Sequence, residues 1–481
     1  MTDAWGAADG RAGVAPATPA PHSAIATTSE DAELDADSTH RGQARLAYRL
    51  AAAHRSRLMH VHGLGWLVYD GRRWVEDKRE EAKLAVLETL RKALSDSLHD
   101  HDLRRDVRKA ESASGVAGIL DLAKPMLAAT IEDLDADPWL LNCANGTLDL
   151  RTRALRPHDP ADRLTRVTTG AYRPDADAAV WEAFLAQVLP SADVRGYLQR
   201  VVGQAVYGRV REHLFPVLTG TGANGKSTAY TAITSALGDY AKVIDPELLM
   251  ARERGRTGGP ELMVLLGARL VVGSETAEGR KLDEAVMKRL TGGDELTARN
   301  LYSPPVTWVP SHQLLYVTNA LPTVRGNDPA VWRRVRVIPF DVTVPPEQRD
   351  PDLPETLRLH ADAILGWVIA GHFDYENNGG MREPASVVAA TDGYRTESDA
   401  VARFVADACE LNPNFHATTR ELFGVWTGWA VRDGAEPLTE KAFSGELVRL
   451  GYESKRTNSG KTWKGLRPIP DQPEIGGGDG W

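Results

Sequence analysis

The stretch FPVLTGTGANGKST, residues 215–228, decides the fold of this chain because it sets a glycine-rich loop between an apolar run and a helix-forming segment. Residues 215–219 predict a buried strand, and residues 227–237 predict a helix. Glycines let successive backbone N–H groups turn toward a phosphate, and the N-terminus of the helix adds a partial positive charge. This order predicts a phosphate-binding loop in an α/β fold.

The side chains of this loop suit a nucleoside triphosphate. Lys226 is placed to reach the β- and γ-phosphates, and the Ser227 hydroxyl is placed to bind a metal. We therefore expect ATP and Mg²⁺ as ligands. The residues predicted to bind the nucleotide are Gly220, Thr221, Gly222, Ala223, Asn224, Gly225, Lys226, Ser227 and Thr228.

A second apolar run, residues 268–274, supplies an acid at its end. Ligands of parallel sheets bind at the carboxyl ends of strands, so Glu275 is expected to hold Mg²⁺ with Ser227 and to activate the attacking water. Glu278 is the second candidate for this role. The alternative for either carboxylate is to cap the helix that follows.

A third apolar run, residues 314–318, ends in Asn319. A neutral amide at this point can position the attacking water beside the γ-phosphate without adding charge. Asn319 could otherwise be a turn residue, since asparagine often ends a strand in that way.

Arginines lead into a fourth run, WRRVRVIPF, residues 332–340. Arg333 or Arg334 is the candidate arginine finger, a guanidinium that one subunit supplies to stabilise the transition state on its neighbour. The alternative is a solvated basic edge.

Together these motifs resemble those of superfamily 3 helicases, and more narrowly those of the phage and poxvirus primase–helicase family. The resemblance spans about residues 45–467, and five motifs carry it: GANGKST at 222–228, SET at 274–276, LTGGD at 290–294, VTN at 317–319 and WRR at 332–334. Upstream of these motifs, LNCANGTLDL at 141–150 resembles the helical pre-helicase domain of the same family. The order of these motifs along the chain is as specific as their composition.

The resemblance implies an AAA+-like motor that forms a ring, usually a hexamer, and moves 3′ to 5′ on single-stranded DNA. It also implies that Lys288 and a hairpin over residues 296–310 line the central channel. The hairpin offers Arg299 to a phosphate and Tyr302 as a stacking face. The alternative is that Tyr302 and Trp308 belong to the core.

Two features depart from the family pattern. Glu275 is followed by a threonine, whereas many superfamily 3 members have two adjacent acids there. Larger relatives also carry a primase domain, for which the folded residues before the motor are too few. Asp133 and Asp135 could suggest a metal site, but they fit an aspartate-rich loop better, so we expect a separate primase.

The end of the folded chain is basic. Residues 441–467 hold seven bases and two acids within a pattern of two helices and a strand–turn–strand, which predicts a winged-helix-like module on DNA phosphates. A solvated charged face is the alternative. The DNA-binding residues expected here are Lys455, Arg456, Lys461 and Lys464.

The predicted fold class is therefore α/β, with an AAA+-like phosphate-loop ATPase core built on a parallel sheet. A mainly helical domain precedes this core and a winged-helix-like domain follows it. The predicted boundaries are an acidic disordered tail at 1–40, a helical and strand-rich domain at 41–200, the ATPase core at 201–345, a helical subdomain at 346–410, the winged-helix-like domain at 411–467 and a disordered tail at 468–481.

Composition excludes several classes of protein. The two cysteines exclude a disulfide framework and a CxxC zinc site, and no apolar window is long enough to span a membrane. The net charge of −9 owes −6 to residues 1–40, so it does not argue against a DNA partner. We expect a location in the cytoplasm of a bacterial host.

The sequence thus predicts an ATP-dependent DNA helicase, a homo-hexamer on single-stranded or forked DNA, which serves replication of a phage or mobile element. Two alternatives remain. One is another phosphate-loop enzyme such as a nucleotide kinase. The other is an origin-binding initiator whose assembly is controlled by nucleotide.

Overall fold

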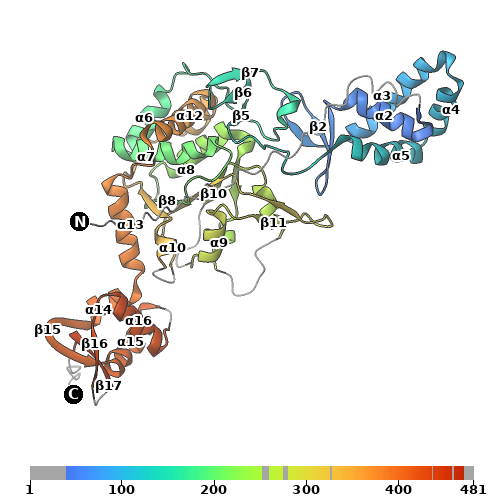
Figure 1. Cartoon of the computed structure of the whole chain (residues 1–481). Helices are drawn as coiled ribbons and strands as arrows, with labels where there is room; N and C mark the ends of the chain where they lie inside the picture. Colours follow the sequence, from blue (N-terminus) through green and yellow to red (C-terminus); the bar gives the residue numbers. More distant parts are fainter. Residues whose placement is uncertain are drawn as a thin grey trace, which may run out of the picture. The chain divides into compact units, whose positions relative to one another are not determined.

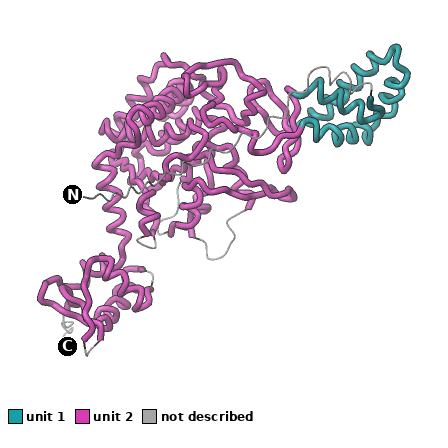
Figure 2. Tube along the Cα trace, in the orientation of Figure 1, with its two compact units in different colours: residues 1–55, 79–127 teal, residues 56–78, 128–481 magenta. Residues whose placement is uncertain are grey.

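The computed structural model describes residues 39–251, 259–274, 280–324, 328–435, 437–457 and 460–470. The chain divides into two compact units (Figures 1 and 2). Among the described residues, the first unit comprises 39–55 and 79–127, and the second comprises 56–78 and the rest of the described chain from 128 on. The predicted domain at 41–200 therefore contributes to both units.

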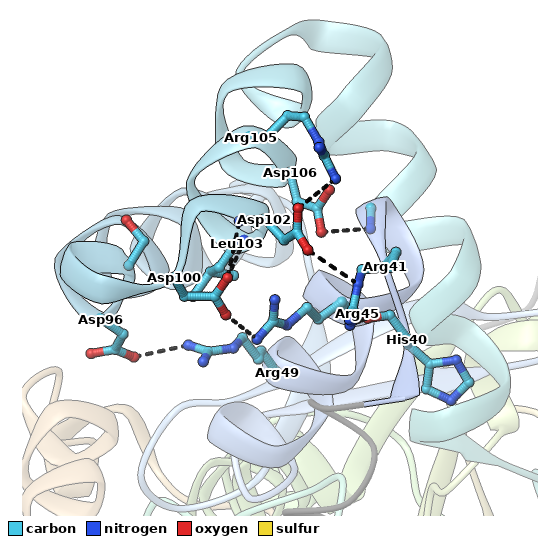
Figure 3. Close-up of polar contacts among 12 residues, drawn as sticks. His40, Arg41, Arg45, Arg49, Asp96, Asp100, Asp102, Leu103, Arg105 and Asp106 are labelled. Atoms are coloured by element: carbon cyan, nitrogen blue, oxygen red, sulfur yellow. Dashed lines mark hydrogen bonds and ion pairs between the residues drawn. The ribbon is translucent and has the colours of Figure 1, made fainter.

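The first unit is helical. A polar cluster joins its helices (Figure 3): Arg45 donates to Asp100 at 2.7 Å, and Arg49 donates to Asp96 at 2.8 Å. Asp100 also accepts from Leu103 N at the start of α4, and this hydrogen bond, followed by that of Arg45, lowers the pKa of its carboxyl. The helices are α2 (Gly42–His54), α3 (Glu81–Asp96), α4 (His101–Ala110) and α5 (Ala113–Ala123).

Two small sheets open the second unit. The first contains a hairpin at Asp70-Gly71, in which Tyr69 pairs with Trp74 and Asp70 accepts from two backbone N–H groups of the turn. Its strands, in sheet order, are β3 (Trp74–Glu76), β2 (Gly65–Tyr69), β1 (Leu58–Val61) and β4 (Ala128–Ala129). The second sheet is formed by β5 (Leu140–Cys143), β6 (Gly146–Asp149) and β7 (Ala154–Arg156).

The central sheet has five strands, and every neighbouring pair is parallel. Pro216 is tolerated in the inner strand β8 because pairing with β13 begins only at Val217. The strands, in sheet order, are β14 (Val335–Pro339), β8 (Phe215–Thr219), β13 (Gln313–Thr318), β10 (Leu270–Ser274) and β9 (Ala241–Ile244). The prediction of a mixed α/β fold with a parallel sheet is confirmed.

Both faces of the central sheet are buried, which explains why its strands are almost entirely apolar. Leu218 and Val317 pack into one hydrophobic cluster with the helices α6, α7, α8 and α12, whereas Val217 and Tyr316 pack into the other with α9. Figure 1 shows the two groups of helices on the two sides of the sheet. The helices are α6 (Ala179–Val188), α7 (Ala192–Gly203), α8 (Lys226–Leu237), α9 (Glu284–Leu290) and α12 (Ala361–Asn378).

The edge strand β14 is covered by the helix α13 (Ala385–Ser398). Thr391 of α13 accepts from Val337 N at 3.0 Å, so the helix satisfies a backbone donor on the open edge of the sheet. Between β13 and β14 lies α10 (Pro329–Trp332), and between β14 and α12 lies α11 (Leu353–Leu359). The antiparallel pair β11 (Leu296–Ala298) and β12 (Val306–Trp308) precedes β13.

The C-terminal module begins before the expected residue 411. Its core includes Val401 and Phe404 of α14, packed with Trp426, Phe443 and Trp463. The module contains α14 (Ala400–Ala408), β15 (Cys409–Thr418), α15 (Thr419–Asp433), α16 (Glu440–Arg449), β16 (Ser454–Thr457) and β17 (Gly460–Pro468), with sheet order β15-β17-β16. Two helices followed by a hairpin match the predicted pattern.

Two buried histidines predict how stability depends on pH. Burial lowers the pKa of His312 to about 4, and burial with nearby arginines lowers that of His372 to about 4. An unfolded histidine has a pKa of about 6.5, so between about pH 6.5 and 4 the unfolded chain binds more protons than the native one. We expect the free energy of unfolding to fall across this window as the pH is lowered, by on the order of 3 kcal/mol per histidine.

Urea denaturation midpoints measured at pH 7.5 and pH 5 test this expectation. The variant His372→Phe cannot titrate and should lose less stability on acidification than the wild type. The variant His101→Phe is a control, because His101 is exposed on the surface of α4. Equal losses in the wild type and His372→Phe would contradict the assignment.

Candidate functional site

The loop after β8 has a backbone that only glycine accommodates at two of its positions. Gly220 has a φ of 155°, and a Cβ there would lie 2.2 Å from the Asn224 amide nitrogen. Gly225 has a φ of 79°, and its Cβ would lie 2.5 Å from a Val188 methyl group. The loop is thus held tightly against its surroundings at both ends, and Gly222 between them has a φ of 102°.

The Lys226 ammonium lies at the centre of this loop and is buried. Its Nζ donates to the Gly220 carbonyl at 2.7 Å, to Asn224 Oδ1 at 3.0 Å and to Asn319 Oδ1 at 3.1 Å. All three acceptors are neutral oxygens. A phosphate oxygen, which carries charge, would be a stronger acceptor than any of them.

Asn224 links the loop to the rest of the sheet. Its Nδ2 donates to the Phe340 carbonyl at 3.1 Å, just past the end of β14, while its Oδ1 accepts from Lys226. Sequence reasoning placed Asn224 in the loop but did not assign it this bridge, because the partner strand lies more than a hundred residues away. The bridge fixes the lysine side chain before any ligand arrives.

Asn319 reaches Lys226 because the strands are in register. Thr318 of β13 pairs with Thr219 of β8, so the residues that follow both strands emerge at the same edge of the sheet. Ser274, the last described residue of β10, pairs with Val317 and lies at that edge too. Glu275 and Glu278 lie outside the described residues.

The N-terminus of α8 faces the same region. Gly225 is its N-cap and supplies no side-chain hydrogen bond to the first turn of this twelve-residue helix. Ser227 is exposed on the first turn and Thr228 is half-buried. An uncapped N-terminus, a glycine-rich turn and a buried ammonium together fit a triphosphate. The Ser227 hydroxyl fits a metal bound beside it.

The two candidate arginines differ in their surroundings. Arg334 is 7% exposed and donates to the Ala330 carbonyl at 2.7 Å, and burial followed by the charge of Arg333 lowers its pKa. Arg333 is exposed, and its guanidinium makes no ion pair or hydrogen bond within the described part of the chain.

Both arginines lie at the sheet edge opposite the loop. The Arg334 carbonyl accepts from Phe215 N at the start of β8, whereas the loop follows Thr219 at its end. Strand β14 alone spans about 13 Å at ~3.3 Å per residue. Arg333 therefore cannot reach the Lys226 site of its own chain past the length of the sheet.

The β11–β12 pair divides its aromatic residues between surface and core. Tyr302 is 98% exposed with a φ of 63°, so the alternative that placed it in the core is wrong. Trp308 is buried, as that alternative expected. Arg299 is exposed on the connecting segment. Lys288 lies on α9 and forms an ion pair with Asp328 at 2.8 Å, which a DNA phosphate would have to replace.

The β16–β17 hairpin presents a row of exposed basic side chains. Arg456 lies directly opposite Lys461 in the register, and like charges at such positions repel unless an anion lies between them. Lys455 and Lys464 are exposed as well, and none of the four forms an ion pair with a described residue. By contrast, Arg467 of the same strand is paired with Glu410 at 2.7 Å.

No described helix has the length and apolar character of a membrane span. Among the described residues, no group of three or more histidine, cysteine, aspartate or glutamate side chains is suited to bind a metal. Asp133 and Asp135 therefore belong to no such group. The Asp135 carboxylate instead accepts hydrogen bonds from the backbone N–H and the hydroxyl of Thr165.

Comparison with solved structures gives a match to the NrS-1 C-terminal region, with a TM-score of 0.48 and 7% sequence identity, over 89% of this chain and 99% of that one. At this identity and TM-score the two chains share only a distant likeness.

Comparison with protein sequences gives viral relatives at higher identity. A protein of Acanthamoeba polyphaga mimivirus named "Putative helicase" is 29% identical over 58% of this chain and 31% of its own length. A "Putative helicase" of Frog virus 3 is 28% identical over 61% and 32%. A "Putative primase" of African swine fever virus is 24% identical over 62% and 34%. The chain spans about a third of the length of these relatives.

Residues 47–190 match the family described as D5 N terminal like. This stretch begins within α2, includes α3, α4 and α5 of the first unit, and continues through β5, β6 and β7 to α6. The matched stretch lies upstream of the loop at Lys226. It contains residues 141–150, which the sequence analysis compared with the primase–helicase family. This part of the chain thus carries a D5 N terminal like domain, and the viral relatives that the chain resembles are named for helicases and primases.

Proposed function

We propose that the chain is a Mg²⁺-dependent ATPase that couples hydrolysis to the unwinding of DNA during replication. The observation that carries the proposal is the buried Lys226 ammonium, held between Asn224 of the loop and Asn319 at the end of the neighbouring strand. A lysine and an amide held together at the carboxyl edge of a parallel sheet are the two groups that phosphoryl transfer to water needs there.

The chain's own residues would act as follows. The loop N–H groups and the N-terminus of α8 bind the phosphates, and Lys226 exchanges one of its neutral acceptors for a γ-phosphate oxygen. Asn319, freed from its bond to the lysine, positions the attacking water, and Glu275 takes its proton. Mg²⁺, held by Ser227 and Glu275, would neutralise charge that develops on the phosphate oxygens.

The remaining parts of the proposal concern assembly and DNA. The position of Arg333 at the far edge of the sheet favours a ring in which one copy acts on the nucleotide of the next, and we propose a hexamer that moves 3′ to 5′. Arg299 and Tyr302 on the exposed connection of β11 to β12, with Lys288, would contact single-stranded DNA. We propose that the chain serves the replication of a phage or mobile element in a bacterial host and acts with a separate primase. The relatives above are encoded by viruses that infect eukaryotes.

The decisive experiment measures ATP hydrolysis with and without single-stranded DNA, together with unwinding of forked duplexes that carry opposite overhangs. A helicase hydrolyses ATP faster with DNA and unwinds one of the two forks. A nucleotide kinase would transfer phosphate to a small acceptor without DNA stimulation, and an origin-binding initiator would bind one sequence with negligible turnover. Either result would overturn the proposal.

The β16–β17 hairpin makes a prediction about DNA affinity. If Arg456 and Lys461 bind phosphates, the double variant Arg456→Ala/Lys461→Ala should weaken binding equally for all sequences. The slope of log affinity against log salt should fall in magnitude by roughly 0.7 to 0.9 for each phosphate that the variant no longer neutralises. Fluorescence anisotropy at several salt concentrations measures this slope.

A matched control removes two charges elsewhere in the same module. Arg420 and Arg432 are exposed on α15, so Arg420→Ala/Arg432→Ala should leave the slope unchanged. If both double variants change the slope equally, the hairpin has no special role, and if the hairpin variant leaves the slope unchanged, its charges form a solvated face.

A further inference from the structure

A pocket lies between α10 and α13, on the sheet edge opposite the Lys226 loop. Its volume is about 240 Å³, and its lining residues are Pro329, Trp332, Arg333, Thr391, Asp392 and Arg395. Figure 1 shows the two helices beside each other. The arginine on α13 carries no motif, and nothing in the sequence associates it with Arg333.

The walls of the pocket are fixed by the residues packed behind it. Trp332 meets Tyr394 edge-on, with ring centroids 5.3 Å apart. Thr391 accepts from Val337 N at 3.0 Å and donates to the Val387 carbonyl at 2.7 Å, which holds α13 on strand β14. Arg395 follows Thr391 by four residues and so lies on the same face of the helix. The pocket is therefore formed before any ligand binds.

The charges of the pocket favour an anion. Two guanidiniums, Arg333 and Arg395, line it with one carboxylate, Asp392. Both arginines are exposed, and within the described residues neither guanidinium forms an ion pair or hydrogen bond. Two planar guanidinium groups match the several oxygens of a phosphoryl group better than a single lysine would.

The size of the pocket limits what can enter it. A volume of about 240 Å³ holds a phosphoryl group with several waters, since a water occupies ~30 Å³. It lies below the ~300–1,000 Å³ typical of sites that enclose a whole small molecule. The ligand is then a phosphate end that another molecule presents. The triphosphate of the same chain is excluded as its source, because that site lies at the other edge of the sheet.

We propose that Arg333 and Arg395 form a two-arginine pocket that receives the terminal phosphates of a nucleotide bound to a second copy of the chain. Arg395 is the new member of the site: a guanidinium from the helical subdomain that stabilises the transferred phosphoryl group beside Arg333. Asp392 keeps the empty pocket from excess positive charge. This inference rests on the proposed function.

The variant Arg395→Ala tests it through steady-state ATP hydrolysis. Loss of one hydrogen-bonded charge at the reacting phosphate should lower kcat roughly 10- to 100-fold while KM for ATP changes little, because the nucleotide still binds at Lys226 of its own chain. Arg395→Lys keeps the positive charge but lacks the forked guanidinium group, so its kcat should lie between those of the wild type and Arg395→Ala. Arg91→Ala, an exposed arginine on α3 without a partner among the described residues, should behave as wild type.

Mixed assemblies show whether the arginine acts across subunits. Lys226→Ala and Arg395→Ala chains, co-expressed and purified through a tag on each, should hydrolyse ATP faster than either variant alone. In the mixture an intact Lys226 of one chain can meet an intact Arg395 of another. No gain over the separate variants would overturn the inference, because an arginine acting on its own chain cannot be rescued in this way.

Two further results separate the possibilities. If Arg395→Ala lowers DNA affinity and its salt dependence but leaves DNA-free ATP hydrolysis intact, the pocket binds DNA phosphates and the inference is wrong. If the wild type hydrolyses ATP and Arg395→Ala does so at the same rate, the inference about Arg395 is wrong, but the proposed function stands. A wild type without ATPase activity would overturn the proposed function as well.

Discussion

Replacement of Lys226 by alanine is expected to reduce ATP hydrolysis by about a thousandfold or more. The ammonium supplies the positive charge of the loop, and it is within 3.1 Å of Asn319 on the next strand. In the proposed mechanism, its loss would remove the interaction with the γ-phosphate. Charge stabilisation at a buried site is worth several kcal/mol in the transition state, which corresponds to this reduction.

The measurement is DNA-stimulated ATP hydrolysis, with nucleotide affinity determined separately by titration of a fluorescent ATP analogue. Lys92→Ala is a suitable control, because Lys92 is exposed on α3 and has no partner among the described residues. A Lys226→Ala chain that is folded and retains full stimulated activity would end the assignment of the loop as a catalytic nucleotide site. Folding is checked by thermal denaturation, since the lysine also bonds to two loop residues.

Alanine substitutions of the adjacent arginines are expected to have opposite effects. Arg333→Ala should lower kcat by roughly 10³- to 10⁵-fold, the range for a guanidinium supplied in trans to phosphoryl transfer, without loss of stability. Arg334→Ala should instead destabilise the fold by roughly 2 kcal/mol, because it removes a charged donor to the Ala330 carbonyl and buried packing. Its activity per folded chain should stay near that of the wild type.

The pair serves as its own control, since the two residues are adjacent and chemically identical. Denaturation midpoints and kcat are measured on both variants. We expect Arg333→Ala to have a large effect on kcat alone, and Arg334→Ala to have a large effect on the denaturation midpoint alone. If Arg334→Ala is stable and inactive while Arg333→Ala is active, the assignment is reversed. If neither changes kcat, then neither residue acts as an arginine finger.

The sequence was most informative where the pattern is local. The segment at 215–237 predicted a strand, a glycine loop and a helix, and the structure has β8, the loop and α8 there. Asp70-Gly71 is likewise a dipeptide typical of a hairpin turn, and in the structure it joins the paired strands β2 and β3. In each case neighbouring residues determine the backbone: apolar runs bury a strand, and glycines allow a positive φ. These local preferences can be read without knowledge of the rest of the chain.

Where the pattern was equally local but the outcome depended on burial, the sequence left two answers open. Tyr302 and Trp308 are both aromatic residues of one hairpin, yet one is fully exposed and the other is buried. Arg333 and Arg334 are identical neighbours with opposite surroundings. Which side chain points inward is set by the elements packed on either side.

What the sequence determined by itself is thus a glycine-rich loop between a strand and a helix, the strands that follow it and the identity of their terminal residues. Only the tertiary structure decided that Asn319 meets Lys226, because strand register brings together residues ninety-three positions apart. It alone placed Arg395 beside Arg333 and divided residues 41–200 between two units. The physical reason is that local propensity acts over a few residues, whereas the packing of the sheet and its helices decides which distant side chains meet.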